Sequence, residues 1–585
     1  MPSYVGVDQE SRWSELQTRL RDHLGLIYPE RDAEDLIPRL LQAAGIHYGH
    51  VANHDSLWSE EDVWLITYGD SIKTDGEVPL RTLERFLQHR LRGMVSGLHI
   101  LPFYPYSSDD GFAVIHYTQV NSALGDWPDI EALCADWDVM FDCVMNHCSS
   151  RSGWFENFKR GVDPGSRYFL TLDPDTDVSS VVRPRTSELL QCVETLAGKR
   201  WVWCTFSPDQ VDLNYEEPDV LIEMVSIVGK YMDAGARSLR LDAVTFLWKE
   251  LGTRCVNLPQ THEIIRLLRT LVEYRDSSFL LITETNIPHL ENLAYFGNGN
   301  EAHMIYNFAL PPLLLHTFLT GDSTAIRNWS AALAPPPPAC CYLNFIASHD
   351  GIGLRPVEGI LSEDQVDDLV TACRSAGGEI SWRSTEGSRR PYELNISLIN
   401  AFSGGDAGFA EQRMLAAHAI MLAFEGLPAI YLHSLVATEN DVERMTHTGH
   451  ARAINRHQWN EADLEAVLDD KSCRHSRVFA AMRHMLSIRR QQPAFHPNAR
   501  QQTLQLLDSR VYGLWRQFEA SGDAVCMLAN VSHEAVSVPC SSLNFTVTEG
   551  CEDLLSGHPV SAYEEALHLG PYQVMWIKPQ AGEVS

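Results

Sequence analysis

Several charged residues stand at the ends of short apolar runs, where they could do chemistry together. Arg240 and Asp242 lie two residues apart in SLRLDAV, Glu284 lies near the end of FLLITET, and Asp350 ends CYLNFIASHD. In a strand, residues two apart point to the same side, so Arg240 and Asp242 would face one interior together. A substitution at a sugar carbon that retains its configuration uses two carboxyl groups. One acts as the nucleophile and the other as the general acid and base. An arginine beside the nucleophile would keep it ionised.

Eight such apolar runs recur along the chain, with amphipathic stretches between them. They span 65–70, 97–103, 139–147, 238–244, 279–285, 304–308, 341–350 and 427–432. Continuous apolar runs are typical of parallel strands buried on both faces. Periodicity alone does not separate a doubly wound sheet from a closed barrel. The polar residues at the C-terminal ends of the runs favour a (β/α)8 TIM barrel, because barrel active sites are built there.

The spacing of the runs predicts the domain organisation. Residues 1–60 are expected to form a helical N-terminal extension, and 61–490 the catalytic barrel. Two gaps between runs are too long for simple loops and predict inserted lobes over the barrel mouth, at about 148–235 and 351–415. After about residue 490 the pattern changes to alternating segments with turns. It predicts an antiparallel β-sandwich over 491–585.

Composition limits the partners. The chain has 46 Lys and Arg against 77 Asp and Glu, a formal net charge of −31, which disfavours nucleic acid and anionic membranes. Several of the 13 cysteines lie inside apolar runs and none forms a zinc-type cluster, so reduced buried thiols are expected (Cys143, Cys204, Cys341 and Cys526). The first residues have no basic start followed by an apolar stretch. We therefore predict a cytoplasmic protein.

Taken together and in this order, the polar run ends resemble the signature regions of the α-amylase superfamily, glycoside hydrolase family thirteen. The third run contributes Asp142, Asn146 and His147 to this pattern. The resemblance implies that Asp242 is the nucleophile, Glu284 the general acid and base, and Asp350 the stabiliser of the transition state. It also implies that three further residues bind the sugar hydroxyls and the nucleophile: Arg240, His147 and His349.

Further stretches resemble the sucrose-phosphorylase branch of that family, above all the glucosylglycerate phosphorylases. They are LITYGD, HILPFYPYSSDDGF, TFSPDQVDLN, FALPPLLLH, SHDGIG and AINR. This resemblance implies transfer of a glucosyl unit from a small α-glucoside to phosphate, with Asp70 and Arg456 on the glucose hydroxyls and Tyr117 as an aromatic platform. One departure is His116, which stands where relatives usually carry Asp.

Glycerate and phosphate are both anions, so an acidic chain of this kind needs cations near its catalytic carboxylates. Arg183, Arg185 and Arg355 on the mouth lobes are the candidates, and solvated loop arginines are the alternative. In amylases the asparagine at the position of Asn146 often ligates calcium. This sequence has no further cluster of oxygen ligands at a suitable spacing, so no metal and no cofactor are expected. Aromatic residues near the mouth would line either a pocket or the core: Tyr104, Tyr106, Phe112, Trp203 and Phe206.

Three functions remain open from the sequence. The first is a phosphorylase whose acceptor is glycerate, glycerol, fructose or fructose 6-phosphate, and the second is an α-glucosidase or transglucosylase on the same barrel. The third, a binding protein that has lost catalysis, is disfavoured because Asp242, Glu284 and Asp350 are all present. The acceptor, the reaction direction in the cell and the oligomeric state are not predicted.

Overall fold

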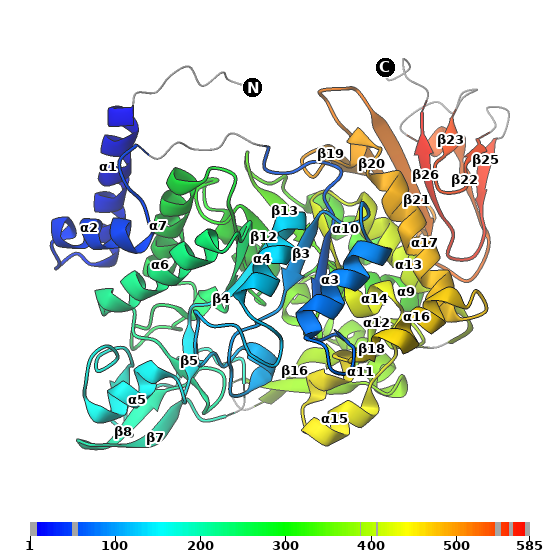
Figure 1. Ribbon diagram of the computed structural model, residues 1–585. Coiled ribbons are helices and arrows are strands. Elements are labelled where there is room, and N and C mark those ends of the chain that lie inside the picture. Colours follow the sequence, from blue (N-terminus) through cyan, green and yellow to red (C-terminus); the bar gives the residue numbers. More distant parts are fainter. Residues whose placement is uncertain are drawn as a thin grey trace.

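The computed structural model describes residues 9–49, 56–185, 187–385, 388–404, 407–543, 551–560 and 565–579. At its centre is a closed barrel of parallel strands (Figure 1). In order around the barrel these are β1 (Trp64–Thr67), β17 (Leu427–Tyr431), β13 (Cys341–Asn344), β12 (Met304–Tyr306), β11 (Leu280–Thr283), β10 (Ser238–Asp242), β4 (Asp138–Val144) and β3 (Gly97–Ile100). Each predicted apolar run overlaps one of these strands, which confirms the (β/α)8 barrel.

The register of the central strands brings the charged side chains to one rim. Arg240 on β10 lies opposite Asp142 on β4 and Ile282 on β11. Every residue of β10 is buried, because the strand is covered by helices outside and by side chains inside. Since all eight strands run parallel, the residues that follow them meet at the C-terminal rim of the barrel.

Helices surround the barrel. Most of the large ones begin with a proline in the first turn, where no backbone hydrogen bond is lost. The surrounding helices are α3 (Pro79–Arg90), α4 (Trp127–Asp136), α6 (Pro218–Asp233), α7 (Pro259–Arg275), α8 (His289–Leu293), α9 (Leu310–Thr320), α10 (Thr324–Ala332), α13 (Ala410–Ala423), α14 (Leu432–Leu435), α16 (Glu461–Asp469) and α17 (Arg474–Arg489). A short pair, β2 (Ile72–Lys73) and β18 (Trp459–Asn460), joins the first and last barrel loops.

Two lobes extend from the C-terminal rim, at the bottom of Figure 1. The first contains β5 (His147–Ser149), α5 (Gly153–Arg160), β6 (Thr171–Leu172), β7 (Leu190–Thr195), β8 (Gly198–Trp203) and β9 (Gln210–Asp212). It is shorter than the predicted 148–235. Residues 218–233 form α6, which buries an apolar face against the barrel and therefore belongs to it.

The second lobe follows β13. It contains β14 (Ile352–Gly353), the 3-10 turn η4 (Arg355–Val357), α11 (Glu363–Ser375), β15 (Glu379–Thr385), β16 (Ser388–Asn395) and α12 (Leu398–Ala401). β14, β16 and β15 form a small antiparallel sheet. The last barrel loop adds α15 (Val442–Thr448) and the 3-10 turn η6 (Ala451–Asn455) beside this lobe.

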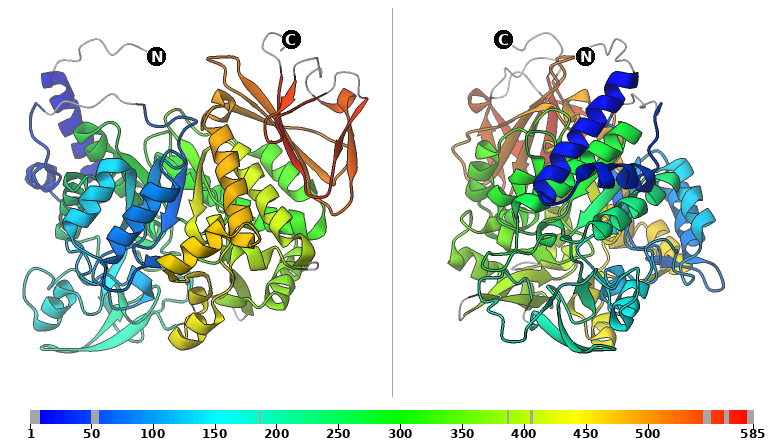
Figure 2. Two further views of the ribbon diagram at one scale, coloured as in Figure 1. Left: turned by 45° about the vertical axis from the view of Figure 1, so that its right-hand side comes forward. Right: turned by 90° about the vertical axis from the view of Figure 1, so that its left-hand side faces the viewer.

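The N-terminal helices and the C-terminal strands pack on opposite sides of the barrel (Figure 2). At the N-terminal end, α1 (Gln9–Ile27) and α2 (Ala33–Ala43) lie against α7 and α6, where His23 Nδ1 is 2.5 Å from Glu263 Oε1. The C-terminal strands form a six-stranded antiparallel sheet: β19 (Arg500–Thr503), β20 (Val511–Gln517), β21 (Ala524–Asn530), β26 (Val574–Lys578), β23 (Glu552–Asp553) and β24 (His558–Pro559). A separate pair, β22 (Val536–Pro539) and β25 (Ala566–Leu569), shares an apolar core with that sheet.

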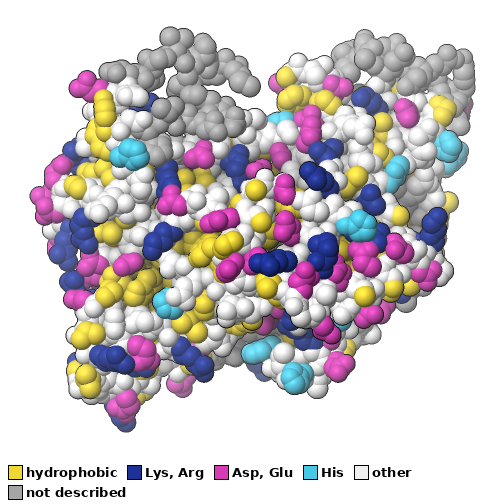
Figure 3. Space-filling model, viewed as in Figure 1, with side chains coloured by type: hydrophobic (Ala, Val, Ile, Leu, Met, Phe, Trp, Pro, Cys, Tyr) yellow, Lys and Arg dark blue, Asp and Glu magenta, His cyan; other side chains and the backbone are white. Residues whose placement is uncertain are grey.

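The surface agrees with the acidic composition. Asp and Glu side chains are spread over the face shown in Figure 3, with Lys and Arg between them. Across the described residues, no helix combines the length and the apolarity needed to cross a membrane.

Candidate active site

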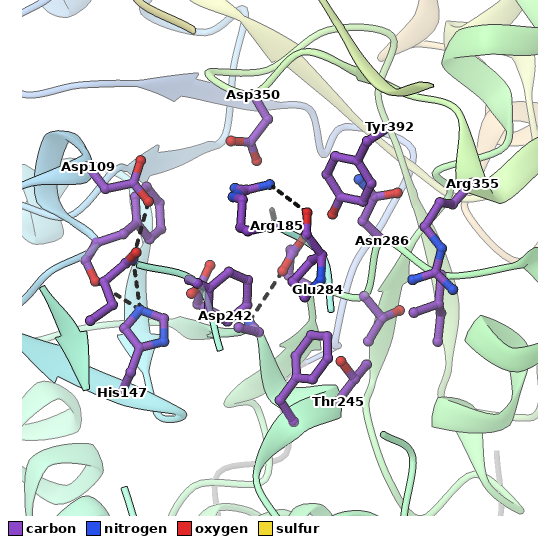
Figure 4. A pocket seen from close by; sticks show the side chains of 18 of the residues that line it. Asp109, His147, Arg185, Asp242, Thr245, Glu284, Asn286, Asp350, Arg355 and Tyr392 are labelled. Carbon is purple, nitrogen blue, oxygen red and sulfur yellow. Dashed lines mark hydrogen bonds between the residues drawn. The ribbon is translucent and has the colours of Figure 1, made fainter. Parts of the chain in front are cut away.

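A cavity opens at the C-terminal rim between the two lobes (Figure 4). The barrel contributes its floor, and the lobes contribute its walls. The lining residues include Arg240, Asp242, Glu284, His349 and Asp350 from the barrel, Arg185, Phe206 and Gln210 from the first lobe, and Arg355 and Tyr392 from the second. The structure therefore brings the three predicted catalytic carboxylates into one cavity.

Arg240 is the centre of the charge network on the floor. Its Nη1 lies 2.8 Å from Asp242 Oδ1 and also binds Asp142, while its Nη2 is 4.0 Å from Glu284 Oε2. The guanidinium carbon also lies over two aromatic rings, 5.4 Å from the ring centre of Phe112 and 5.7 Å from that of Tyr306. The i, i+2 spacing predicted that Arg240 and Asp242 would share a face, and they do.

Asp242 and Glu284 compete for charge. Burial raises the pKa of both carboxyl groups, and the negative charge of Glu284 raises the pKa of Asp242 further. Two buried carboxylates this close hold a proton between them more readily than either would alone. Arg240 is 2.8 Å from Asp242 and 4.0 Å from Glu284, so the charge is favoured on Asp242 and the proton on Glu284. This is the protonation state that a nucleophile and a general acid require.

Asp350 has the opposite electrostatics. Burial acts to raise its pKa, but the cations around it prevail and hold the pKa well below its usual range. Arg452 Nη1 lies 2.7 Å from Asp350 Oδ1, and Arg456 Nη2 lies 3.7 Å from the same oxygen. Asp350 is therefore a fixed negative charge beside the Asp242 and Glu284 pair.

The two histidines of the floor are neutral. Burial lowers the pKa of both His147 and His349. The His349 ring stacks on Phe112 at 5.1 Å and nearly parallel, and His147 Nε2 lies 3.1 Å from Gln210 Nε2. A neutral imidazole has one donor and one acceptor nitrogen, which suits sugar hydroxyls.

Two predicted sugar-binding residues, Asp70 and Arg456, line a second, neighbouring pocket. Arg456 Nη1 binds Asp110 Oδ2 at 2.6 Å, and Asp110 lines the same pocket. Asp70 accepts a hydrogen bond from Gln458 and lies 3.4 Å from Lys73 Nζ.

Tyr117 lies outside the cavity. Its hydroxyl donates to the carbonyl oxygens of Val144 at 3.0 Å and His147 at 2.7 Å, and its ring stacks on Trp154 at 5.4 Å. Phe112, which packs on His349, is one of the aromatic residues that line the cavity.

The candidate arginines separate into two groups. Arg185 and Arg355 line the cavity, whereas Arg183 does not. Arg355 is 5% exposed, and no carboxylate of the described residues lies within ion-pair distance of it. The guanidinium of Arg185 lies over the rings of Phe206 and Tyr392, at 5.9 and 5.5 Å. Burial lowers the pKa of Arg183.

Sequence reasoning missed several residues of the site. Arg452 lies in the same ARAINR stretch as Arg456. A second arginine four residues before Arg456 was the signal in the sequence that could have pointed to it. Asp109 and Asp110 have φ of 54° and 45°, a strained backbone that is common at functional sites, and it is visible only in the structure. Asn286 also lines the cavity, with no hydrogen-bond partner for its Oδ1 among the described residues.

The side chain of Asn146 is occupied by a cation from the chain itself. Lys249 Nζ lies 2.9 Å from Asn146 Oδ1 and 3.0 Å from Asp212 Oδ2. Within the described ranges, no group of three or more His, Cys, Asp or Glu side chains is placed to hold a metal ion.

The chain is similar to a known family, to known proteins and to a solved structure. Residues 91–328 match the family model of the α-amylase catalytic domain. The chain is 43% identical to a glucosylglycerate phosphorylase of Allomeiothermus silvanus, over 84% of this chain and 89% of that protein. It is 39% identical to the glucosylglycerate phosphorylase of Escherichia coli, over 96% of this chain and 100% of that protein. The crystal structure of sucrose 6F-phosphate phosphorylase from Thermoanaerobacter thermosaccharolyticum superposes with a TM-score of 0.70 at 23% identity, over 83% of this chain and 95% of that one.

The barrel, its lobes and its three rim carboxylates thus define a catalytic domain of the α-amylase type. The chain belongs to the α-amylase family, as the sequence resemblance predicted. Within that family it belongs to the branch that contains the glucosylglycerate and sucrose phosphorylases.

Proposed function

We propose that the protein is a retaining glycoside phosphorylase. It cleaves 2-O-α-D-glucosyl-D-glycerate with phosphate and gives α-D-glucose 1-phosphate and D-glycerate. The observation that carries the proposal is the position of Arg185 and Arg355, two arginines without a carboxylate partner among the described residues, in a cavity whose floor is lined by carboxylates. The names of relatives that are 39% to 43% identical support the same substrate.

In the first half-reaction, an Asp242 oxygen attacks the anomeric carbon of glucose. The bond between that carbon and the glycerate oxygen breaks, and Glu284 gives its proton to this oxygen. In the second, a phosphate oxygen attacks the same carbon, the bond to Asp242 breaks, and Glu284 takes the phosphate proton. The fixed charge of Asp350 stabilises the cationic transition state of both steps. Side chains and phosphate make every transfer, so the proposal includes no cofactor.

The glucose ring would lie over the floor between His147 and His349, with Phe112 beside it. The Arg456 and Asp110 pair would bind hydroxyls at the far side. Asp70 lines the same pocket as that pair, so its proposed contact with glucose requires the sugar to extend into this pocket. Tyr117 would support His147 from behind through the hydrogen bond to its carbonyl oxygen.

The anion site would serve glycerate first and phosphate second. Both anions lie on the acceptor side of the anomeric carbon, and Figure 4 shows Arg185 and Arg355 around Glu284 and Tyr392. A buried guanidinium without a counter-ion is costly, and an anionic substrate supplies one. Arg183 is close in sequence but outside the cavity, so we give it a supporting role only.

We place the reaction in the cytoplasm, where phosphate is abundant and the charged product is retained. Its partners in this proposal are the small glucoside and phosphate.

The deciding experiment runs the reaction in the synthetic direction. The purified protein is given α-D-glucose 1-phosphate with D-glycerate, glycerol, fructose, fructose 6-phosphate or water alone, and phosphate release is measured with Asp242→Asn as the blank. Fast release with glycerate alone supports the proposal. Fast release with another acceptor keeps the phosphorylase and replaces the acceptor, and release with water alone means a hydrolase.

Arg355→Gln tests the anion site. Loss of one charge-assisted hydrogen bond is worth about 1.5–3 kcal/mol, so KM for glycerate should rise by about 10- to 100-fold. Arg390→Gln is the matched control, because Arg390 lies on β16 near Tyr392 but pairs with Glu363 on the surface. An unchanged KM for glycerate in Arg355→Gln would remove this arginine from the anion site.

A further inference from the structure

Glu393, on β16 of the second lobe, is a buried carboxylate that the catalytic scheme does not use. Its side chain is fully buried, at 0% exposure. Its two oxygens bind Arg452 at two points, with Nε and Nη2 each at 3.1 Å. Its Oε1 also accepts the backbone N–H of Gly351 at 3.0 Å. Both partners of Glu393 therefore belong to the immediate surroundings of Asp350.

Arg452 carries the first connection. A guanidinium is planar, so a carboxylate that binds two of its nitrogens also fixes the direction of the third. With Nε and Nη2 on Glu393, the remaining Nη1 lies 2.7 Å from Asp350 Oδ1. The orientation of Arg452 toward Asp350 thus depends on Glu393.

The backbone carries the second connection. Gly351 directly follows Asp350, and a Cβ at this glycine would lie 2.4 Å from the Leu394 carbonyl oxygen and 2.6 Å from Glu393 Cγ. The segment after Asp350 is therefore pressed against β16 at a distance that only glycine permits. β14 then continues in register with β16, with Gly353 opposite Glu393.

We propose that Glu393 is a positioning residue that holds Asp350 in place from two sides, through Arg452 and through the backbone of Gly351. It connects the second lobe to the transition-state carboxylate, so the lobe is part of the catalytic apparatus as well as a wall of the cavity. This inference rests on the proposed glucosyl transfer, but only on its first half-reaction, whichever acceptor is used.

The alternative is that Glu393 only stabilises the fold of the lobe as a buried ion pair. A double-mutant cycle separates the two roles, because residues that act through each other are not additive. The variants are Glu393→Gln, Asp350→Asn and the double variant. The donor is α-D-glucosyl fluoride, whose leaving group departs without a proton, so that slow variants remain measurable. Fluoride release reports formation of the bond to Asp242 directly.

We expect Glu393→Gln to lower kcat by about 10- to 100-fold, the cost typical of a misplaced catalytic group. KM should change much less, since Glu393 does not line the cavity. In the Asp350→Asn background the same substitution should have less than a threefold effect. Effects that multiply in the double variant, or a wild-type kcat in Glu393→Gln, would overturn the proposal.

Glu301→Gln is the matched control for loss of a buried ion pair. Glu301 is also fully buried and pairs with His262 and Arg266, each at 2.7 Å, away from the cavity. It should lower the melting temperature and leave kcat within about twofold. If Glu393→Gln does not fold, Arg452→Lys enters the same cycle, since lysine keeps the charge but loses the two-point contact. If the phosphorylase assignment fails, fluoride release still depends on Asp242, so the two failures can be told apart.

Discussion

The three catalytic carboxylates have the same chemical group, and their neighbours give them different roles. Asp242 has Arg240 beside it at 2.8 Å, and Asp350 has Arg452 at 2.7 Å. Glu284 has no cation closer than 4.0 Å among the described residues, and it accepts only the N–H of Ala243 at 3.2 Å. By these distances Glu284 is the carboxyl group whose charge is least stabilised by a cation, which favours it as the one that carries the proton.

The pH profile tests that role. Because burial raises the pKa of Glu284, the acid should keep its proton to a higher pH than an exposed glutamate and lose it as pH rises further. The turnover of glucosyl glycerate should therefore fall on the alkaline side. Glu284→Gln should lose about 100-fold or more of this activity but retain fluoride release from glucosyl fluoride, which needs no acid. The measurement is kcat/KM against pH for both donors. Equal losses on the two donors would contradict the role.

At this scale the sequence was informative at the C-terminal ends of the strands. Asp242, Glu284 and Asp350 were predicted because each stands at or near the end of an apolar run, in an order that resembles the signature regions of the family. Asp110, Arg452 and Glu393 were not, because their contacts are tertiary: Arg456 and Asp110 are 346 residues apart, and Arg452 and Glu393 are 59 apart. A pairwise contact between loops leaves no periodic pattern in one sequence.

Among the elements, strands were easier to predict than lobes. All eight barrel strands coincide with predicted apolar runs to within one residue at their starts, because burial on both faces requires a continuous apolar segment. The predicted end of the first lobe lies too far along the chain. The amphipathic residues of α6 directly follow the lobe, and the boundary between them was not recognised in the sequence. Tyr117 was expected under the sugar, yet its hydroxyl binds backbone carbonyl oxygens at the turn between β4 and β5.

Tyr117→Phe tests the role of that turn. The hydroxyl donates to Val144 and His147 carbonyl oxygens, and removing it leaves buried acceptors without a partner. We expect the free energy of unfolding to fall by about 1–3 kcal/mol, with kcat/KM within about threefold of wild type. Urea unfolding and steady-state kinetics measure the two quantities. An unchanged stability with a large rise in KM would restore Tyr117 as a sugar-binding residue.

Across the whole molecule, two buried arginines lie near the junction of the barrel helices and the C-terminal sheet, and one of them, Arg516 on β20, joins the two directly. Arg489 and Arg516 are both fully buried. Arg489 donates to the carbonyl oxygens of Leu422 and Phe495 at 3.0 and 3.1 Å, and Arg516 donates to that of Ala423 at 2.6 Å. These bonds satisfy backbone acceptors at the junction, so the C-terminal sheet is an integral part of the fold rather than an appended module.

Glu425, at the same junction, makes stability depend on pH. Its side chain is 7% exposed, and burial, partly offset by Arg516, raises its pKa from 4.5 to about 7. A carboxyl group whose pKa is raised on folding binds more protons in the folded state between these two values. Its contribution to stability is therefore fully present below about pH 4.5 and is lost as pH rises through about 7.

Glu425→Gln should remove this dependence. At about 1.4 kcal/mol per pKa unit, the variant should be more stable than wild type by up to about 3 kcal/mol at pH 8.5, and the difference should shrink toward zero near pH 4.5. Urea unfolding at several pH values measures it. Glu439→Gln, at an exposed ion pair with Arg474, should show a difference of less than about 1 kcal/mol throughout. A Glu425→Gln variant less stable than wild type at pH 8.5 would mean that the ionised carboxylate stabilises the junction through Arg516.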